Sequence, residues 1–265
     1  MRFETKKAEA LLKELYRFNA SLGWILAIRG IEYFRCVEYA WVFQRMPNQG
    51  PLRILDIGPW RSPLPLFLAR KGHYMSITDL PEGIALQRRL MARVPPGLRV
   101  ISRVLADNGK NGALPFADSS FDLILCISTI EHLPGDGDTL LSGEIHRLLG
   151  PGGSALITVP YRLRYHEGQM GQWFERRYDR IALEQRLIGS HPWASEDLYF
   201  FRDHRTAWFT RLYWKVPKVL RTGLGWLQIW VALHYLRRDR ASEEDAGLAC
   251  LHLRKTGVNA EVHHG

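Results

Sequence analysis

Cysteine is scarce in this chain, which has only Cys36, Cys126 and Cys250 among its 265 residues. The three are odd in number, widely spaced and set in apolar segments. A disulfide framework and a Cys-x-x-Cys metal site are therefore not indicated. We expect three reduced thiols in the core, and we propose no metal site.

Long apolar runs are absent as well. No stretch of about 18 apolar residues is present to span a bilayer. The chain does not open with a basic segment, an apolar run and a small-residue cleavage site. The sequence therefore predicts a cytoplasmic protein, and its hydrophobic content of 46% fits one globular domain with additions.

Acidic residues are the minority among the charged ones. The chain has 27 acidic and 36 basic residues, which gives a formal net charge of +9. An excess of this kind suits an anionic partner, either nucleic acid or the surface of an acidic membrane. Charge alone does not choose between the two.

What the sequence does contain is an alternation of apolar strands and helices. Segments of strand length and largely apolar character occur at residues 53–57, 74–78, 100–106, 121–127 and 154–159. Helical patterns lie between them at residues 64–71, 83–93 and 139–149. Because buried strands alternate with helices, we predict an α/β fold with a mostly parallel sheet and helices on both faces.

Helical periodicity also marks the N-terminal segment, where Leu11, Leu15, Phe18 and Leu22 recur at intervals of three and four residues. We therefore predict an N-terminal helical cap before the sheet. A further helix is expected at residues 179–188, and two last strands at 198–201 and 248–254. The predicted organisation is a cap (1–50), a main domain (51–256) that contains an insertion (209–240), and a C-terminal tail (257–265).

The most informative motif is RILDIGPWRSPLP at residues 53–65, an apolar strand that runs into a tight turn. An acidic residue, Asp79, ends the next strand about 20 residues further on. The turn offers free backbone N–H groups, and the carboxylate can accept hydrogen bonds from both hydroxyls of a ribose. Together they predict a nucleoside site. A nicotinamide dehydrogenase is disfavoured, because only Gly58 of the G-x-G-x-x-G glycines is present and Trp60 and Ser62 follow it.

A second stretch, LPFADSSFDLILCISTIEHLPGDGDTLLSGEIHRLLGPGGSALITVP at residues 114–160, completes the pattern. Together the two motifs resemble the class I S-adenosylmethionine-dependent methyltransferases, most closely the methyltransferase-11-like group. The resemblance covers residues 52–160 well and the rest loosely. It implies a Rossmann-like methyltransferase fold with an antiparallel edge strand, and S-adenosyl-L-methionine as the cofactor.

The resemblance also assigns cofactor-binding positions at the ends of the strands. Asp79 is placed to hold the ribose hydroxyls, although a strand-end Asp can also cap the helix that follows it. The family usually has a glycine where this chain has Trp60. Ser62 has an alternative role as a helix N-cap, and Asp107 with Asn108 as a turn. The predicted cofactor-binding residues are Asp56, Gly58, Ser62, Asp79, Asp107, Asn108 and Ser128.

Methyl transfer from a sulfonium is a direct displacement, so a general base is needed only when the acceptor must lose a proton. The segment ISTIEH corresponds to the family motif that lines the methyl-transfer centre, and His132 is its predicted catalytic base. Loop polarity is an equal alternative for that histidine. Residues 161–178 are expected to form a loop over the site, and Tyr161, His166 and Tyr178 are the predicted substrate contacts.

The insertion at 209–240 is rich in Trp, Leu and basic residues. Its apolar stretch, 223–236, is too short for a span, which needs about 20 residues. One interpretation is burial as a lid or dimer surface. The other is peripheral contact with the inner membrane surface through cationic and aromatic side chains. In that case a lipid, quinone or lipid-linked sugar would be a natural acceptor.

We predict methyl transfer from S-adenosylmethionine to a small-molecule or lipid-like acceptor, at oxygen. An RNA methyltransferase is the first alternative, since the net charge permits it. Nucleic acid is nevertheless not an expected partner, because no appended RNA-binding module and no Asn-Pro-Pro-Tyr type motif are found. The second alternative is a non-catalytic binding protein in which Trp60 closes the cofactor pocket.

Overall fold

The structure is a computed structural model of the whole chain. It describes residues 5–47, 50–94, 100–104, 113–171, 173–189, 191–202, 215–217, 229–230, 232 and 243–257. Three groups of predictions therefore lie outside the described residues: Asp107 with Asn108, most of the 209–240 insertion, and the tail after residue 257.

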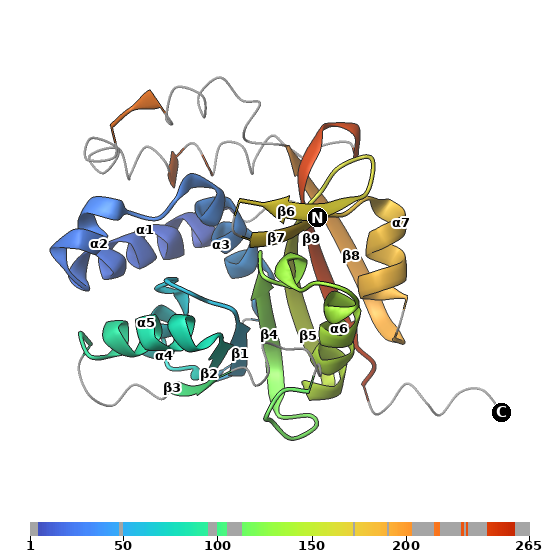
Figure 1. Cartoon of the computed structure of the whole chain (residues 1–265). Coiled ribbons are helices and arrows are strands. Elements are labelled where there is room, and N and C mark those ends of the chain that lie inside the picture. The colour runs from blue at the N-terminus through green and yellow to red at the C-terminus, as the bar shows by residue number, and fades with distance from the viewer. Residues whose placement is uncertain are drawn as a thin grey trace.

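A seven-stranded sheet forms the centre of the molecule, in the order β3-β2-β1-β4-β5-β9-β8 (Figure 1). The strands are β1 (Arg53–Ile57), β2 (Tyr74–Asp79), β3 (Val100–Val104), β4 (Phe121–Ile127), β5 (Leu149–Pro160), β8 (Trp193–Arg202) and β9 (Ala246–Lys255). The pairs from β3 to β5 are parallel, whereas β9 runs antiparallel to both β5 and β8. The predicted mixed sheet is confirmed, and its antiparallel strand lies second from the edge.

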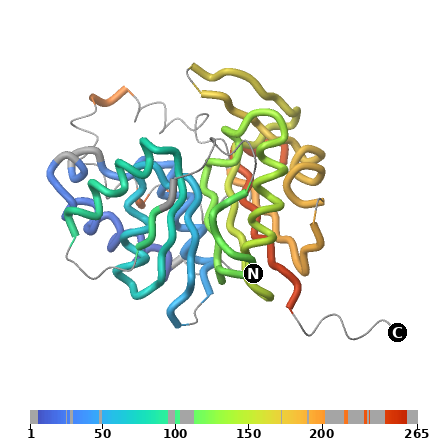
Figure 2. Tube along the Cα trace, turned by 60° about the horizontal axis from the view of Figure 1, so that its bottom comes forward, coloured from blue at the N-terminus to red at the C-terminus, as the bar shows by residue number. Residues whose placement is uncertain are grey.

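The order of the strands reverses between β1 and β4. The chain builds β1, β2 and β3 outward in one direction and then returns to place β4 beside β1. Figure 2 shows the result: the N-terminal half, blue to blue-green, and the C-terminal half, green to red, meet at this point. Open α/β sheets bind their ligands at the carboxyl ends of the strands where the order reverses.

Helices cover both faces of the sheet, as the alternation of strands and helices predicts. The helices that follow β1, β2 and β4 are α4 (Leu64–Arg70), α5 (Pro81–Met91) and α6 (Gly137–Leu148). Ile54 and Leu123 point to one face, into a core shared with α4, and their neighbours Leu55 and Ile124 point to the other, into a core shared with α6. Strands buried on both sides explain the unbroken apolar runs of the sequence.

The N-terminal segment forms three helices: α1 (Thr5–Ser21), α2 (Trp24–Arg29) and α3 (Tyr33–Arg45). Leu12 and Leu15 of α1 are fully buried, and so is Trp41 of α3. All three side chains belong to the core on the α4 face of the sheet. The N-terminal helices are thus packed on the sheet, while the division into a cap and a main domain remains a prediction.

The main departure from the predicted elements is a β-hairpin. Strands β6 (His166–Met170) and β7 (Trp173–Arg177) pair antiparallel, where the sequence predicts a loop. The turn between them includes Gly171 at a φ of 66°. In Figure 1 this 166–177 hairpin crosses above β4 and β5. It is followed by the predicted helix at 179–188, which consists of α7 (Arg180–Leu183) and the π-helical turn η3 (Glu184–Ile188).

Two further predictions concern cysteines and membrane spans. All three cysteines are buried and free, as expected from their apolar surroundings. Among the residues that the structure describes, no helix combines the length and the apolar character needed to cross a bilayer.

Candidate functional site

Two cavities adjoin at the carboxyl ends of β1 and β4. The first, which we call the β1 cavity, has a volume of about 350 Å³ and the second, the β4 cavity, about 480 Å³. Phe34 and Arg35 of α3 line both. Each volume is typical of a small-molecule site. The two cavities therefore give room for two ligands side by side.

Asp56 and Gly58 form the floor of the β1 cavity. Asp56 is 2% exposed. Burial, together with the nearby Asp79 carboxylate, raises the pKa of Asp56 well above its ordinary value, and Arg35 opposes this. Gly58 has a φ of +68°, and a Cβ placed on it would lie 2.2 Å from Cγ2 of Thr129. Only glycine fits this position, because both the backbone conformation and the space exclude a side chain.

Asp79 is held against the turn that follows β1. Its Oδ2 accepts a hydrogen bond from the backbone N–H of Trp60 at 2.7 Å, and its Oδ1 accepts one from Leu80 at 2.7 Å. Burial nevertheless raises the pKa of Asp79 above its ordinary value. The carboxylate predicted to hold the ribose is thus hydrogen-bonded directly to the turn after β1, through the backbone N–H of Trp60.

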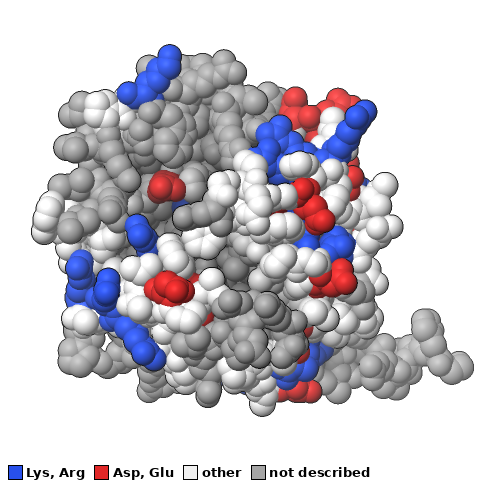
Figure 3. Space-filling model, viewed as in Figure 1, with Lys and Arg blue, Asp and Glu red and all other residues white. Residues whose placement is uncertain are grey.

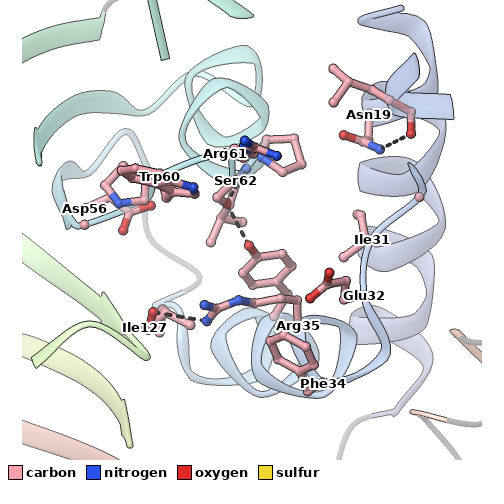
Figure 4. A pocket seen from close by; sticks show the side chains of 17 residues that line it. Asn19, Ile31, Glu32, Phe34, Arg35, Asp56, Trp60, Arg61, Ser62 and Ile127 are labelled. Carbon is pink, nitrogen blue, oxygen red and sulfur yellow. Dashed lines mark hydrogen bonds between the residues drawn. The ribbon is translucent and has the colours of Figure 1, made fainter. Parts of the chain in front are cut away.

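Trp60 adopts a conformation that glycine would favour, with a φ of 48°. For an L-residue this left-handed conformation costs roughly 1–2 kcal/mol. Its ring lies beside Asp56 on the wall of the β1 cavity (Figure 4). The indole contacts the ring of Trp173 edge to face, with the centroids 6.1 Å apart. The side chain therefore narrows the β1 cavity without filling it.

Ser62 and its neighbours fix the remainder of the turn. Gln87 of α5 is fully buried and donates from Nε2 to the carbonyls of Trp60 and Ser62, at 3.0 and 2.9 Å. The Ser62 hydroxyl accepts a hydrogen bond from Tyr39 at 2.7 Å, drawn as a dashed line in Figure 4, and another from the Leu64 N–H at 3.1 Å. Ser62 thus serves as an anchor of the turn, at the start of α4.

The β4 cavity has a buried carboxylate, Glu38, in its wall. Oε1 of Glu38 accepts hydrogen bonds from the Ser128 and Thr158 hydroxyls, and Oε2 accepts one from Arg35. Arg35 also donates to the carbonyl of Ile127 at 3.1 Å. The predicted cofactor residue Ser128 therefore lies on the β4 cavity and binds a carboxylate of α3.

His132 lies on the wall of the same cavity. Its Nδ1 is 2.7 Å from the carbonyl oxygen of Phe174 in the 166–177 hairpin. Because a carbonyl only accepts, Nδ1 carries the hydrogen, and the lone pair is left on Nε2. Nε2 lies 3.9 Å from Oε1 of Glu131. The ring is thus oriented by one nitrogen and able to accept a proton at the other.

Glu131 is 2% exposed and lines the β4 cavity beside His132. Burial raises its pKa to about 8, and the neighbouring carboxylates of Glu38 and Glu175 act in the same direction. Its Oε2 has no hydrogen-bond partner among the described residues. A buried polar atom in this state marks a position that a ligand can satisfy.

The three predicted substrate residues lie in different places. Tyr161 lines the β4 cavity, and burial with the neighbouring Glu243 carboxylate raises its pKa to about 12. His166 is exposed at the start of β6. Tyr178 is fully buried, and its hydroxyl donates to Asp138 at 2.9 Å. Of the three, the structure brings only Tyr161 to a cavity wall.

Helix α3 carries functional residues that the sequence analysis missed. Arg35, Glu38 and Tyr39 come from a segment interpreted only as a helical cap, yet all three line the cavities. The sequence did contain a signal for them: Arg35 and Glu38 are two charged residues, three positions apart, inside the otherwise apolar run YFRCVEYAWVF. Such a pair on a buried helix needs partners from another element.

Comparison with a family model supports the resemblance seen in the sequence. Residues 55–157 match a model described as a methyltransferase domain, of the methyltransferase-11 family. The matched region runs from β1 to β5 and includes Asp56, Gly58, Asp79 and His132. No curated protein sequence matches the chain.

Several solved structures share the fold at low sequence identity. The [4+2]-cyclase SpnF has 19% identity and a TM-score of 0.53, over 84% of this chain and 80% of its own. An S-adenosylmethionine-dependent methyltransferase from Mesorhizobium loti has 14% identity and a TM-score of 0.53, over 84% of this chain and 100% of its own. A third structure is phosphoethanolamine N-methyltransferase 2 from Haemonchus contortus, in complex with phosphomonomethylethanolamine and S-adenosylhomocysteine. It has 17% identity and a TM-score of 0.51, over 83% of this chain and 52% of its own.

The donor set in and beside the β1 cavity fits S-adenosylmethionine. Asp56 lines the cavity near the end of β1, and Asp79, at the end of β2, lies next to its wall, bonded to the N–H of Trp60. Carboxylates at the ends of these two strands are suited to the hydroxyl groups of a ribose. Carboxylates also suit the positive charge of a sulfonium. The matched model, the strand order and this donor set identify residues 55–157 as a class I S-adenosylmethionine-dependent methyltransferase domain.

Proposed function

We propose that the enzyme methylates a hydroxyl group of a small molecule bound in the β4 cavity. The observation that supports this is the pair of adjoining cavities, which share Phe34 and Arg35. Of the predicted cofactor residues, Asp56, Gly58 and Ser62 line the β1 cavity, and the β4 cavity has His132 and Glu131. Direct displacement depends on holding donor and acceptor side by side, and two adjoining cavities meet that requirement.

His132 is the proposed general base. When bound, S-adenosylmethionine supplies an electrophilic methyl group on its sulfonium. Nε2 of His132 would take the proton of an acceptor hydroxyl in the β4 cavity, and Asp56 with the turn after β1 would hold the cofactor in the β1 cavity, where it would supply the methyl group. Phe174 keeps Nδ1 protonated, so that Nε2 is the nitrogen that accepts. The products are the methyl ether, S-adenosylhomocysteine and the proton.

The wall of the β4 cavity combines polar groups that suit an acceptor hydroxyl with apolar surface. Its lining includes the polar groups of Ser128, Glu131 and His132 beside Phe34 and Leu248, and its volume is about 480 Å³. The sequence-based alternative of a lipid-like acceptor depends on the 209–240 insertion, most of which lies outside the described residues. Peripheral membrane contact and a cytoplasmic location remain predictions.

The described charge on the face seen in Figure 3 is mixed, which does not favour the RNA alternative. Basic and acidic side chains are interspersed on the right-hand side, and several basic side chains gather at the lower left beside an acidic one. Ion pairs such as Arg147 with Asp118, and Arg186 with Asp136, illustrate the same mixture. RNA binding relies on basic surfaces that are free to meet phosphates.

The experiment supplies ¹³C-methyl-labelled S-adenosylmethionine to the purified enzyme together with a small-molecule extract, a lipid extract or total RNA. We expect label in the small-molecule fraction, with the carbon shift of a methoxy group, and at least a hundredfold less with the His132→Gln variant. Label in RNA, in lipid or at nitrogen would contradict the proposal. So would an unchanged rate in the variant.

A further inference from the structure

The 166–177 hairpin contacts both cavities through two consecutive residues. Trp173, at the start of β7, is 47% exposed and packs its ring against Trp60 of the β1 cavity, with an interplanar angle of 81°. Phe174, the next residue, accepts the hydrogen bond from His132 of the β4 cavity. Strand β7 therefore contacts Trp60 on the wall of the β1 cavity and His132, the proposed general base, in the β4 cavity.

Trp60 has particular need of such a contact. Its backbone is in the left-handed region, which disfavours any residue with a Cβ. Its N–H and C=O are held by Asp79 and Gln87, but its ring is only half-buried. The edge-to-face contact with Trp173 is a ring contact of the kind that changes an equilibrium constant by about two- to twelvefold.

The strand that carries Trp173 is firmly anchored. Arg176, two residues after Phe174, is fully buried, and its guanidinium donates to the carbonyls of Leu133 and Gly135. Its Nη1 also lies 3.6 Å from the buried carboxylate of Asp138. Because β7 is fixed in this way, a side chain at its start can hold a neighbour in place.

We propose that Trp173 is a positioning residue for methyl transfer. It holds the Trp60 ring on the wall of the β1 cavity, and through β7 it couples that wall to the orientation of His132. The coupling to His132 rests on the proposed function, whereas the contact with Trp60 does not. Cofactor binding in the β1 cavity, which Trp60 lines, should therefore be sensed at His132 across the hairpin.

Calorimetric titration with S-adenosylhomocysteine tests the first part of the proposal, that Trp173 holds the Trp60 ring in place. We expect Trp173→Leu to weaken binding by about fivefold, within the range of an aromatic pair, and Trp173→Phe by less than about twofold. Met170→Ala is the matched control, because Met170 pairs with Trp173 across the hairpin. It should bind like the wild type. If Trp173→Leu does not fold, Trp173→Gln, which suits an exposed strand position, takes its place.

The second part of the proposal, the coupling of the β1 cavity to His132, is tested by NMR. The measured quantities are the ring ¹⁵N signals of His132, which are assigned by their loss in His132→Gln. S-adenosylhomocysteine should shift these signals in the wild type and in Trp173→Phe, and leave them in place in Trp173→Leu. Wild-type affinity in Trp173→Leu, or an equal loss in Met170→Ala, would overturn the proposal. If S-adenosylhomocysteine shifts the His132 signals in Trp173→Leu as far as in the wild type, the coupling is overturned even if methyl transfer by His132 is established.

Discussion

Gly58 bears two constraints at once, and they can be separated by mutation. Its φ is positive, and a Cβ would clash with Thr129. Gly72 offers the matched control, since its φ is +97° and nothing lies within 4 Å of the Cβ it would gain. We expect Gly72→Ala to cost about 1 kcal/mol of stability from backbone strain alone. Gly58→Ala should cost more than twice as much.

Urea unfolding measures both variants, and titration with S-adenosylhomocysteine shows the effect on the site. Gly58→Ala should lower the affinity at least tenfold, because Thr129 or the turn must move, whereas Gly72→Ala should leave it unchanged. Equal stability losses in the two variants would mean that Thr129 yields and the steric constraint is weak.

Glu131 makes stability depend on pH. Its pKa in the folded protein is about 8, above the ordinary value of 4.5. Between these values the folded state holds a proton that the unfolded state has lost, so stability from this group falls as pH rises, by up to about 1.4 kcal/mol per unit. Glu131→Gln cannot titrate and should gain stability relative to the wild type from pH 5 to pH 8.

The difference in free energy of unfolding between wild type and Glu131→Gln, measured at several pH values, tests this sign. A difference that stays constant from pH 5 to pH 8 would show that Glu131 is ionised over the whole range, and a partner for its Oε2 would then have to be found.

At the scale of elements, the 166–177 hairpin depends on Arg176. Asp138 keeps its pair with Arg186, but the carbonyls of Leu133 and Gly135 lose their donor, so Arg176→Met should destabilise the protein by about 3 kcal/mol. Arg177→Met, one position along, loses only the partly exposed pair with Glu175 and should cost less than about 1 kcal/mol. Thermal unfolding compares the two, and similar losses would contradict the anchoring role of Arg176.

Helix α3 should act on cofactor affinity through a single hydroxyl. Tyr39 donates to Ser62 in the turn after β1. Tyr39→Phe removes that donor and should weaken S-adenosylhomocysteine binding by about two- to twelvefold, the effect of one hydrogen bond. Ser62→Ala combined with Tyr39→Phe should cost no more than the larger single change. Fully additive losses would mean that the two residues act separately.

Elements differed in how well the sequence predicted them. Strand β4 was predicted correctly because it is apolar from Leu123 to Ile127, and its residues from Leu123 to Cys126 are fully buried. The 166–177 hairpin was missed because HEGQMGQWFERR contains no β-branched residue and no apolar alternation. Its pairing depends on tertiary contacts, above all those of Arg176, which local sequence does not reveal.

Across the whole molecule, the sequence predicted where the candidate cofactor residues lie, and which residues surround the β4 cavity only in part. Asp56 and Asp79 lie at the ends of β1 and β2, and Gly58 follows β1, so local sequence and topology were enough to place them. Their role in binding the cofactor stays a prediction. The β4 cavity combines the segment after β4 with residues from β5, β7, β9 and α3. Glu38 meets Ser128 and Thr158 across 90 and 120 residues of chain. Such contacts depend on the fold as a whole.

The central claim is that the β1 cavity binds S-adenosylmethionine through the turn after β1 and the carboxylate of Asp79. Calorimetric titration with S-adenosylhomocysteine tests it most directly, with NAD as control ligand and Asp79→Asn as a variant of equal size. We predict micromolar binding of S-adenosylhomocysteine, no binding of NAD, and at least a tenfold loss in the variant. Absence of binding to the wild type, or unchanged affinity in Asp79→Asn, would contradict the account.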